Sequence, residues 1–269
     1  MNDKIAKTDS IKRPDVFLSE LRRAFNWVVH HKVAFWSSVV VFLLLGIVFV
    51  AVDWRTKSQE LALQAEYYPA EKAYQDKKSK FAEALRQSEA AKAKKGSSVS
   101  KPESLPSGDM EKDYGKDIEA FSAILEKAPK SNAGKMAALQ LSEIYSDHGR
   151  TEQALGVLQM TEVKGSPSTL IDALIYVRKA SLKAAAQDCD SAKKIAELLA
   201  KSKVGEDLSY PVKIRTALCL QSNRQDEARA LLTEVVGAKS EDKDRDQQLE
   251  TFRREARMWL RTIPKANGT

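Results

Sequence analysis

The chain has 269 residues, with 44 Lys and Arg against 37 Asp and Glu, so its formal net charge is +7. A nucleic-acid-binding surface needs clustered basic residues with interleaved aromatic ones, whereas basic and acidic residues are mixed along this chain. We therefore expect no nucleic-acid partner. Apart from one apolar run, the chain is rich in Ala, Leu, Lys, Glu and Gln and has few β-branched runs. This composition predicts an all-α fold.

A run of twenty uncharged residues, 33–52, predicts one transmembrane helix. At about 1.5 Å per residue, such a helix crosses a hydrocarbon layer of roughly 30 Å. A cleaved signal peptide would have a shorter apolar core, about 7–15 residues, and a small-residue cleavage site. The sequence VAVDW at 50–54 is a poor cleavage site. A buried core helix of this length and composition is rare in a soluble domain, so we interpret the run as an uncleaved anchor.

The segment before the anchor, 1–32, is short and basic, and residues 14–31 have the apolar spacing of an amphipathic helix. Basic residues beside a span favour the cytoplasmic side, although their excess over the other flank is small here. Long C-terminal domains are translocated whatever their charge. We therefore predict a cytoplasmic N-terminus with residues 53–269 outside the cytoplasm. A cytosol-facing receptor, in the reverse orientation, is the alternative.

Residues 53–95 are predicted to form a helical stalk. Apolar and aromatic side chains recur there every three or four residues, and we expect this stripe to pack on the domain that follows: Leu63, Tyr67, Ala70, Tyr74, Phe81 and Ala84. Pro69 is expected to kink this helix or to start a new one. The next segment, 96–112, is rich in Ser, Lys, Pro and Gly and is predicted to be a flexible linker.

From residue 113 the chain repeats a local pattern. The segments 149–158 and 223–232 share a turn residue followed by Arg, an acidic residue, Ala and Leu, and weaker copies begin at 115 and 188. A period near 34–40 residues is typical of a helix–turn–helix array. The residues predicted to pack successive repeats are Ala120, Ala154, Ala192, Ala228, Gly149 and Asn223. A second alignment of the first copy puts Asp117 in place of Ala120.

The repeats are predicted to occupy 113–237, with their first helices at 132–147, 170–186 and 210–221. Gly149 and Asn223 are residue types that tolerate the left-handed conformation with which many helices end. Prolines are expected between repeats, where a helix must stop and restart: Pro129, Pro167 and Pro211.

The array is predicted to end in a capping helix. The segment 238–263 carries an apolar stripe from Leu249 to Ile263, and 264–269 is a short tail. Repeat arrays need an end whose outer face is polar. We expect a solvated outer face here, made by Arg253, Arg254, Arg257 and Arg261.

The segment 137–154 resembles a tetratricopeptide repeat, since Tyr145, Gly149 and Ala154 stand in that family's register. The whole layout is also similar to one bacterial family: a basic N-terminus, one span, a Tyr/Ala-rich helix and a small repeat domain. That family is the inner-membrane ancillary subunit of the Sec translocon, a single-pass protein with a periplasmic repeat domain. The resemblance implies a bacterial inner-membrane location and binding to translocon subunits, periplasmic chaperones or exported clients.

No catalytic constellation is visible in the sequence. His30 and His31 are adjacent and point to different sides of a helix, and there is no phosphate-binding loop, no Cys/His metal spacing and no elbow serine. We therefore expect no enzyme activity, no cofactor, no metal and no small-molecule substrate. Cys189 and Cys219 are interpreted as two free, partly buried thiols, with a single bridge between them as the alternative.

A membrane-anchored module that binds other proteins is the function these features favour. In such arrays the first helices line the binding face. The predicted partner-binding groove comprises Met136, Leu139, Glu143, Leu174, Val177, Ser181, Tyr210, Lys213 and Ala217. The alternative for its apolar members is ordinary core. The alternative function is a structural scaffold subunit of a cell-envelope complex for secretion, pilus assembly or division.

Overall fold

The computed structural model describes residues 22–23, 27, 29–93 and 105–264. Every regular element in these ranges is a helix, so the predicted all-α fold is confirmed for them. Most of the amphipathic helix predicted at 14–31 lies outside the described residues. The chain divides into two compact units, 1–59 and 60–269.

In the first unit, the dominant feature is the beginning of helix α2, which runs from Lys32 to Ala93. This helix contains a segment long and apolar enough to cross a membrane, judged by length and composition. None of its most apolar 18-residue window is buried inside the protein, so it is not a core helix of this chain. The helix continues through Pro69 without a break, so no new helix starts there.

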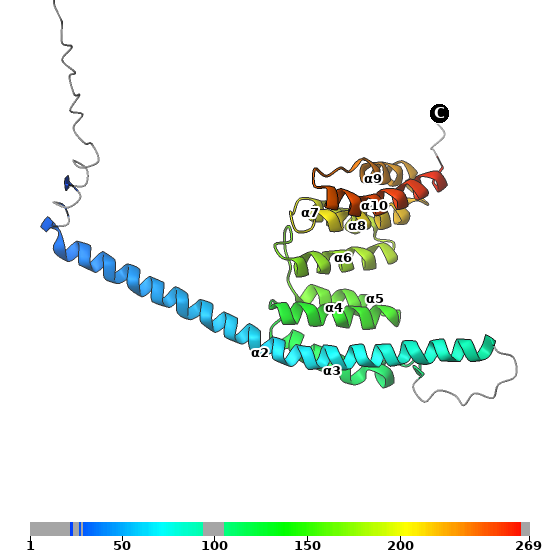
Figure 1. The fold of residues 1–269 in the computed structure, drawn as a ribbon, viewed down its shortest axis with the longest axis horizontal. Coiled ribbons are helices and arrows are strands. Elements are labelled where there is room, and N and C mark those ends of the chain that lie inside the picture. The colour runs from blue at the N-terminus through cyan, green and yellow to red at the C-terminus, as the bar shows by residue number, and fades with distance from the viewer. Residues whose placement is uncertain (1–21, 24–26, 28, 94–104, 265–269) are drawn as a thin grey trace, which may run out of the picture. The chain divides into compact units, whose positions relative to one another are not determined.

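The second unit contains the rest of α2 and the helices that follow it. They are α3 (Met110–Lys127), α4 (Asn132–Asp147), α5 (Thr151–Met160), α6 (Leu170–Ala185), α7 (Cys189–Ala200), α8 (Glu206–Leu220), α9 (Gln225–Gly237) and α10 (Lys243–Thr262). From α3 onward each helix contacts its successor in the chain, least extensively between α5 and α6, and α4, α6 and α8 also contact one another in turn. Figure 1 shows these three stacked as successive layers.

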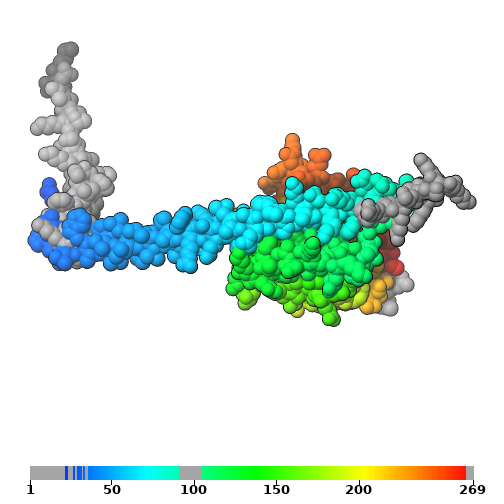
Figure 2. All heavy atoms as spheres, turned by 90° about the horizontal axis from the view of Figure 1, so that it is seen from below, coloured from blue at the N-terminus to red at the C-terminus, as the bar shows by residue number. Residues whose placement is uncertain are grey.

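The second half of α2 is the first layer of this unit. Tyr67 and Tyr74 are buried, and each ring lies 5.9 Å from that of Phe121 in α3. Phe81 of α2 makes an edge contact with Tyr114, which also lies in α3. Figure 2 shows this part of α2, in cyan, packed along the green helices. The expected packing of the Tyr/Phe stripe is thus present. The segment 53–95, predicted as a stalk, is divided between the two units, because residues from 60 onward belong to the second.

Several predicted boundaries are close to those observed. The first helix of the central repeat, 132–147, coincides with α4, and 170–186 differs from α6 by one residue. The predicted linker, 96–112, ends earlier, because α3 begins at Met110 with Asp109 as its side-chain cap. Pro211 is not between repeats: α8 begins at Glu206 and includes it. A proline removes one backbone hydrogen bond but leaves the rest of the helix intact.

The turns after α4 and α6 are built alike. Gly149 has φ 72°, and the following amide donates to the carbonyl of Tyr145 at 2.8 Å. After α6 the left-handed residue is Gln187, with φ 62°, and the following amide donates to the carbonyl of Lys183 at 2.9 Å. Asn223 is not left-handed, so that prediction was wrong. The turn after α8 is instead closed by hydrogen bonds to Leu220 and needs no positive φ.

The predicted packing alanines recur at one structural position. Ala154, Ala192 and Ala228 are each the fourth residue of their helices, and all three are fully buried. Ala120 is only partly buried, whereas Asp117 is 6% exposed and forms an ion pair with Lys77 of α2. Neither residue is the fourth of α3, which begins at Met110, so the first copy does not share the position of the three alanines.

Cys189 and Cys219 form a disulfide, with their Cα atoms 5.7 Å apart, so the preference for free thiols was wrong. Cys189 begins α7 and Cys219 lies in the last turn of α8, and the antiparallel contact of these helices brings the two ends together. The sequence separation is 30 residues. In the chain-entropy model, a loop of that length stabilises the fold by about 3–4 kcal/mol.

Gly134 is required where α4 starts against the end of α3. A Cβ built there would lie 2.1 Å from the carbonyl oxygen of Ala128, so the backbone would have to move. We expect Gly134→Ala to lower the free energy of unfolding by at least about 2 kcal/mol. Thermal unfolding of the detergent-solubilised chain, followed by circular dichroism, measures this.

Gly156, which is exposed in α5 and has open space where a Cβ would stand, is the matched control. There alanine removes only the backbone entropy cost of glycine, so Gly156→Ala should stabilise by about 0.5–1 kcal/mol. Equal effects of the two substitutions would contradict the close approach of α4 to Ala128.

Candidate protein-binding face of α4, α6 and α8

The predicted groove residues of α4 and α6 are at least partly exposed, whereas those of α8 are buried. Met136, Leu139, Val177 and Ser181 are partly exposed, and Leu174 is 39% exposed. Met136, Leu139 and Val177 also pack against buried core clusters, as the alternative of ordinary core expects. The predicted members from α8 are buried: Tyr210, Lys213 and Ala217. The groove as predicted therefore stops at α6.

The helices that follow α8 explain this correction. Tyr210 stacks on Phe252 of α10 at a centroid distance of 6.5 Å. The Nζ of Lys213 lies 2.5 Å from a carboxylate oxygen of Glu234 in α9. The two closing helices thus cover the side of α8 that was predicted to line the groove. The neighbouring Pro211 is partly exposed and Arg215 is exposed.

The predicted member Glu143 of α4 is also occupied. It forms an ion pair with Lys78, which reaches it from α2. At the N-terminus of the same helix, Glu60 of α2 accepts hydrogen bonds from the amides of Asn132 and Ala133 at 3.1 and 3.0 Å. These contacts hold α2 beside α4. The carboxylate of Glu143 is therefore already paired within the chain.

Two rows of side chains cross the helices at a regular spacing, and we call them the apolar row and the polar row. The apolar row is Met136, Leu174 and Pro211, which are 38 and 37 residues apart. The polar row is Gln140, Arg178 and Arg215, each one helical turn after its apolar neighbour. All six side chains are at least partly exposed. Pro211 was missed because the predicted register was short by one residue at α8. The whole polar row was missed because the prediction followed the spacing i, i+3, i+7 and not i+4.

Each member of the polar row reaches back to the preceding layer. The Nη2 of Arg178 donates to the carbonyl oxygen of Ser142 at 3.2 Å, and the Nη1 of Arg215 donates to the hydroxyl of Ser181 at 2.7 Å. The amide nitrogen of Gln140 is 3.5 Å from the Tyr67 hydroxyl, at the limit of hydrogen bonding. These contacts with neutral groups set the direction in which the side chains extend across the face.

Leu170, the first residue of α6, adds an apolar contact area that sequence reasoning missed. Its side chain is 57% exposed. It follows Thr169, which forms a capping box with Asp172: the Thr169 hydroxyl accepts from the amide of Asp172 and its own amide donates to the carboxylate. Leu170 is the first residue of its helix, so the spacing of apolar residues along the helix does not indicate which way its side chain points.

The relative placement of α4 and α6 depends on an ion pair that is largely shielded from water. The Nζ of Lys135 lies 2.7 Å from Oδ1 of Asp172, a close charge contact rather than a directed hydrogen bond. Burial alone would raise the pKa of Asp172, but Lys135, Thr169 and Ser168 outweigh burial and hold that pKa below its usual value. The charged carboxylate is therefore the form that stabilises the fold.

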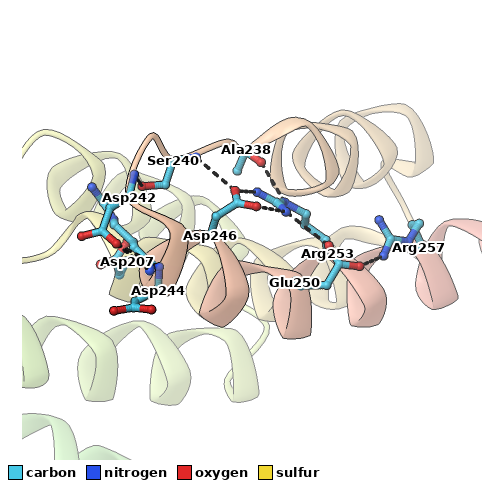
Figure 3. Close-up of polar contacts among 10 residues, drawn as sticks. Asp207, Ala238, Ser240, Asp242, Asp244, Asp246, Glu250, Arg253 and Arg257 are labelled. Atoms are coloured by element: carbon cyan, nitrogen blue, oxygen red, sulfur yellow. Dashed lines mark hydrogen bonds and ion pairs between the residues drawn. The ribbon is translucent and has the colours of Figure 1, made fainter.

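A denser polar network closes the other end of the unit (Figure 3). Arg253 of α10 forms an ion pair with Asp246, approaches Glu250 at 3.2 Å and donates to the carbonyl of Ala238 at 2.8 Å. Its side chain is only 12% exposed, so it does not belong to a solvated outer face as predicted. The guanidinium lowers the pKa of Asp246 below its usual value. This network joins α10 to the loop before it and serves structure.

Within the described residues, no group of three or more His, Cys, Asp or Glu side chains could hold a metal ion. No protein-family model, curated protein sequence or solved structure matches this chain. The similarity to the ancillary translocon subunit therefore rests on the layout of the chain and on the few repeat positions quoted above.

The ion pair between Lys135 and Asp172 predicts a pH-dependent stability. A carboxylate whose pKa is lower in the folded state than in the unfolded state stabilises the fold above the unfolded pKa, near 3.9. That stability is lost as pH falls through the folded pKa. We expect Asp172→Asn to destabilise by about 3 kcal/mol at pH 7, because Lys135 loses its counter-charge.

The difference from the wild type should shrink as the pH is lowered below about 4. Thermal unfolding between pH 7 and pH 2 measures it. Glu126→Gln removes an exposed carboxylate of α3 and is the matched control, expected to change stability by less than about 0.5 kcal/mol. A difference for Asp172→Asn that stays constant with pH would show that the ion pair contributes nothing.

Proposed function

We propose that this protein is a membrane-anchored module that binds other proteins through the face formed by α4, α6 and α8. The observation that carries the proposal is the exposed apolar surface of Leu170 and Leu174, one turn apart on α6, with the partly exposed Met136 on α4 and Pro211 on α8. Contiguous apolar surface bordered by polar groups is typical of protein-binding sites. A stack of helix pairs resembling tetratricopeptide repeats supports the same conclusion, since such stacks function by recognition.

The proposed location is the bacterial inner membrane, with the N-terminus in the cytoplasm and the helical domain in the periplasm. The apolar segment of α2 supports a single-pass anchor. The disulfide between Cys189 and Cys219 supports an oxidising compartment for the domain, because structural disulfides are rare in reducing cytosol.

Translocon subunits, periplasmic chaperones or exported clients are the partners we propose first, on the resemblance in layout. A structural scaffold within a secretion, pilus or division complex is the second candidate. The polar network around Arg253 and the disulfide support the scaffold, because both make the domain rigid. The identity of the bound protein distinguishes the two. No catalytic role is proposed.

A photo-crosslinking amino acid at position 174, in the full chain in its native membrane, should give discrete crosslinked species. We expect translocon subunits, chaperones or exported proteins among them when the products are identified by mass spectrometry. The matched control is position 258, since Met258 is 52% exposed on α10 and lies outside the proposed face. Crosslinks of equal yield and identity at 174 and 258 would contradict a specific face, and a single dedicated envelope subunit at 174 would favour the scaffold.

The redox state of the cysteines tests the proposed compartment. Cells are quenched in acid and treated with a maleimide polymer that slows migration of any protein with free thiols. We expect no shift without reductant and a double shift after reduction, because Cys189 and Cys219 are bridged. A shift without reductant would place the domain in a reducing compartment.

A further inference from the structure

We propose that the face of α4, α6 and α8 binds an extended acidic segment, whose carboxylates pair with Arg178 and Arg215 while its apolar side chains contact Leu174 and Pro211. This inference rests on the proposed protein-binding function and states the chemistry of the partner. Its starting point is charge: among the described residues, neither arginine forms an ion pair with a carboxylate.

Two arginines of neighbouring elements, Arg245 in α10 and Arg224 before α9, show the contrast. Arg245 pairs with both Glu206 and Asp207, at 2.7 and 2.8 Å. Arg224 pairs with Asp190 at 2.8 Å. Arg178 and Arg215 have only hydroxyl or carbonyl partners, which leave their positive charge without compensation. A guanidinium that presents several donors in a plane is suited to a carboxylate.

The spacing of the two arginines limits the conformation of the bound segment. They hold equivalent positions on contacting helices, and packed helices lie about 8–10 Å apart. In a polyproline II helix, residues i and i+3 point the same way and are about 9.3 Å apart. In a β-strand, the residues on one side are i and i+2, about 6.7 Å apart, or i and i+4, about 13 Å apart. The face therefore favours two acidic residues three positions apart.

The apolar row supplies the second part of recognition. Leu174 precedes Arg178 by one helical turn, and Pro211 precedes Arg215 by the same interval, so the two rows run parallel about 5–6 Å apart. A segment lying along the polar row can place the side chains between its two acids on the apolar row. Met136 and Gln140 extend both rows without charge over α4, where we expect neutral residues of the partner.

The test uses dye-labelled ten-residue peptides and the full chain in a non-ionic detergent, with binding followed by fluorescence anisotropy. The peptides carry leucines and two aspartates spaced i,i+2, i,i+3 or i,i+4, or two asparagines spaced i,i+3. We expect the i,i+3 aspartate peptide to bind at least about threefold more tightly than the other spacings, and its affinity to fall as salt rises. Arg178→Gln and Arg215→Gln should each lower that affinity about 3- to 10-fold.

Arg254→Gln is the matched control, because it removes an exposed arginine of α10 and leaves the face unchanged. Circular dichroism verifies that each variant folds. Equal binding of the asparagine peptide, or an equal loss with Arg254→Gln, would overturn the proposal. So would the absence of peptide binding while crosslinks at position 174 persist, a result that leaves the protein-binding function in place. The absence of both would remove the proposed function as well.

Discussion

The packing of α2 on α3 is the contact on which the arrangement of the second unit depends. Tyr67 and Tyr74 bury their rings against Phe121, and aromatic side chains contribute the largest apolar areas available to a core. Burial raises the pKa of Tyr67 to about 12, so its hydroxyl stays protonated at any physiological pH. The helix that contains the apolar membrane-type segment thereby also supplies the first layer of the helical stack.

The two ends of the stack are closed by different means. At the first end, α2 supplies apolar rings together with the ion pairs of Lys77 and Lys78. At the last end, α10 supplies an apolar stripe around Leu249 and a network centred on Arg253. Several charges at each end are therefore compensated inside the chain. Arg178 and Arg215, which form no ion pair with a carboxylate among the described residues, lie between the ends, on α6 and α8, where we propose that a partner binds.

Local features of the sequence predicted local features of the structure. Pro129 and Gly149 lie on either side of α4 and marked its bounds. The repeated pattern of a turn residue, Arg, an acidic residue and Ala located the buried alanines. The exposed side of α8 could not be predicted in that way. Its register depends on the last two helices, and nothing local to 206–220 reveals that α10 covers Tyr210. The turn at Gln187 escaped for a similar reason, since its left-handed conformation is imposed by the hydrogen bonds that close the turn.

The disulfide connects the compartment to the proposed binding face. It joins the start of α7 to the end of α8, so the loop that it closes contains both Pro211 and Arg215. Removing the bridge would widen the unfolded ensemble and lower the stability of α8, which carries one of the three members of each row. Arg215 would then be held to α6 chiefly by its hydrogen bond to Ser181, a contact that is weak for an exposed pair. We therefore expect reduction of the disulfide to disturb the position of Arg215 relative to Arg178.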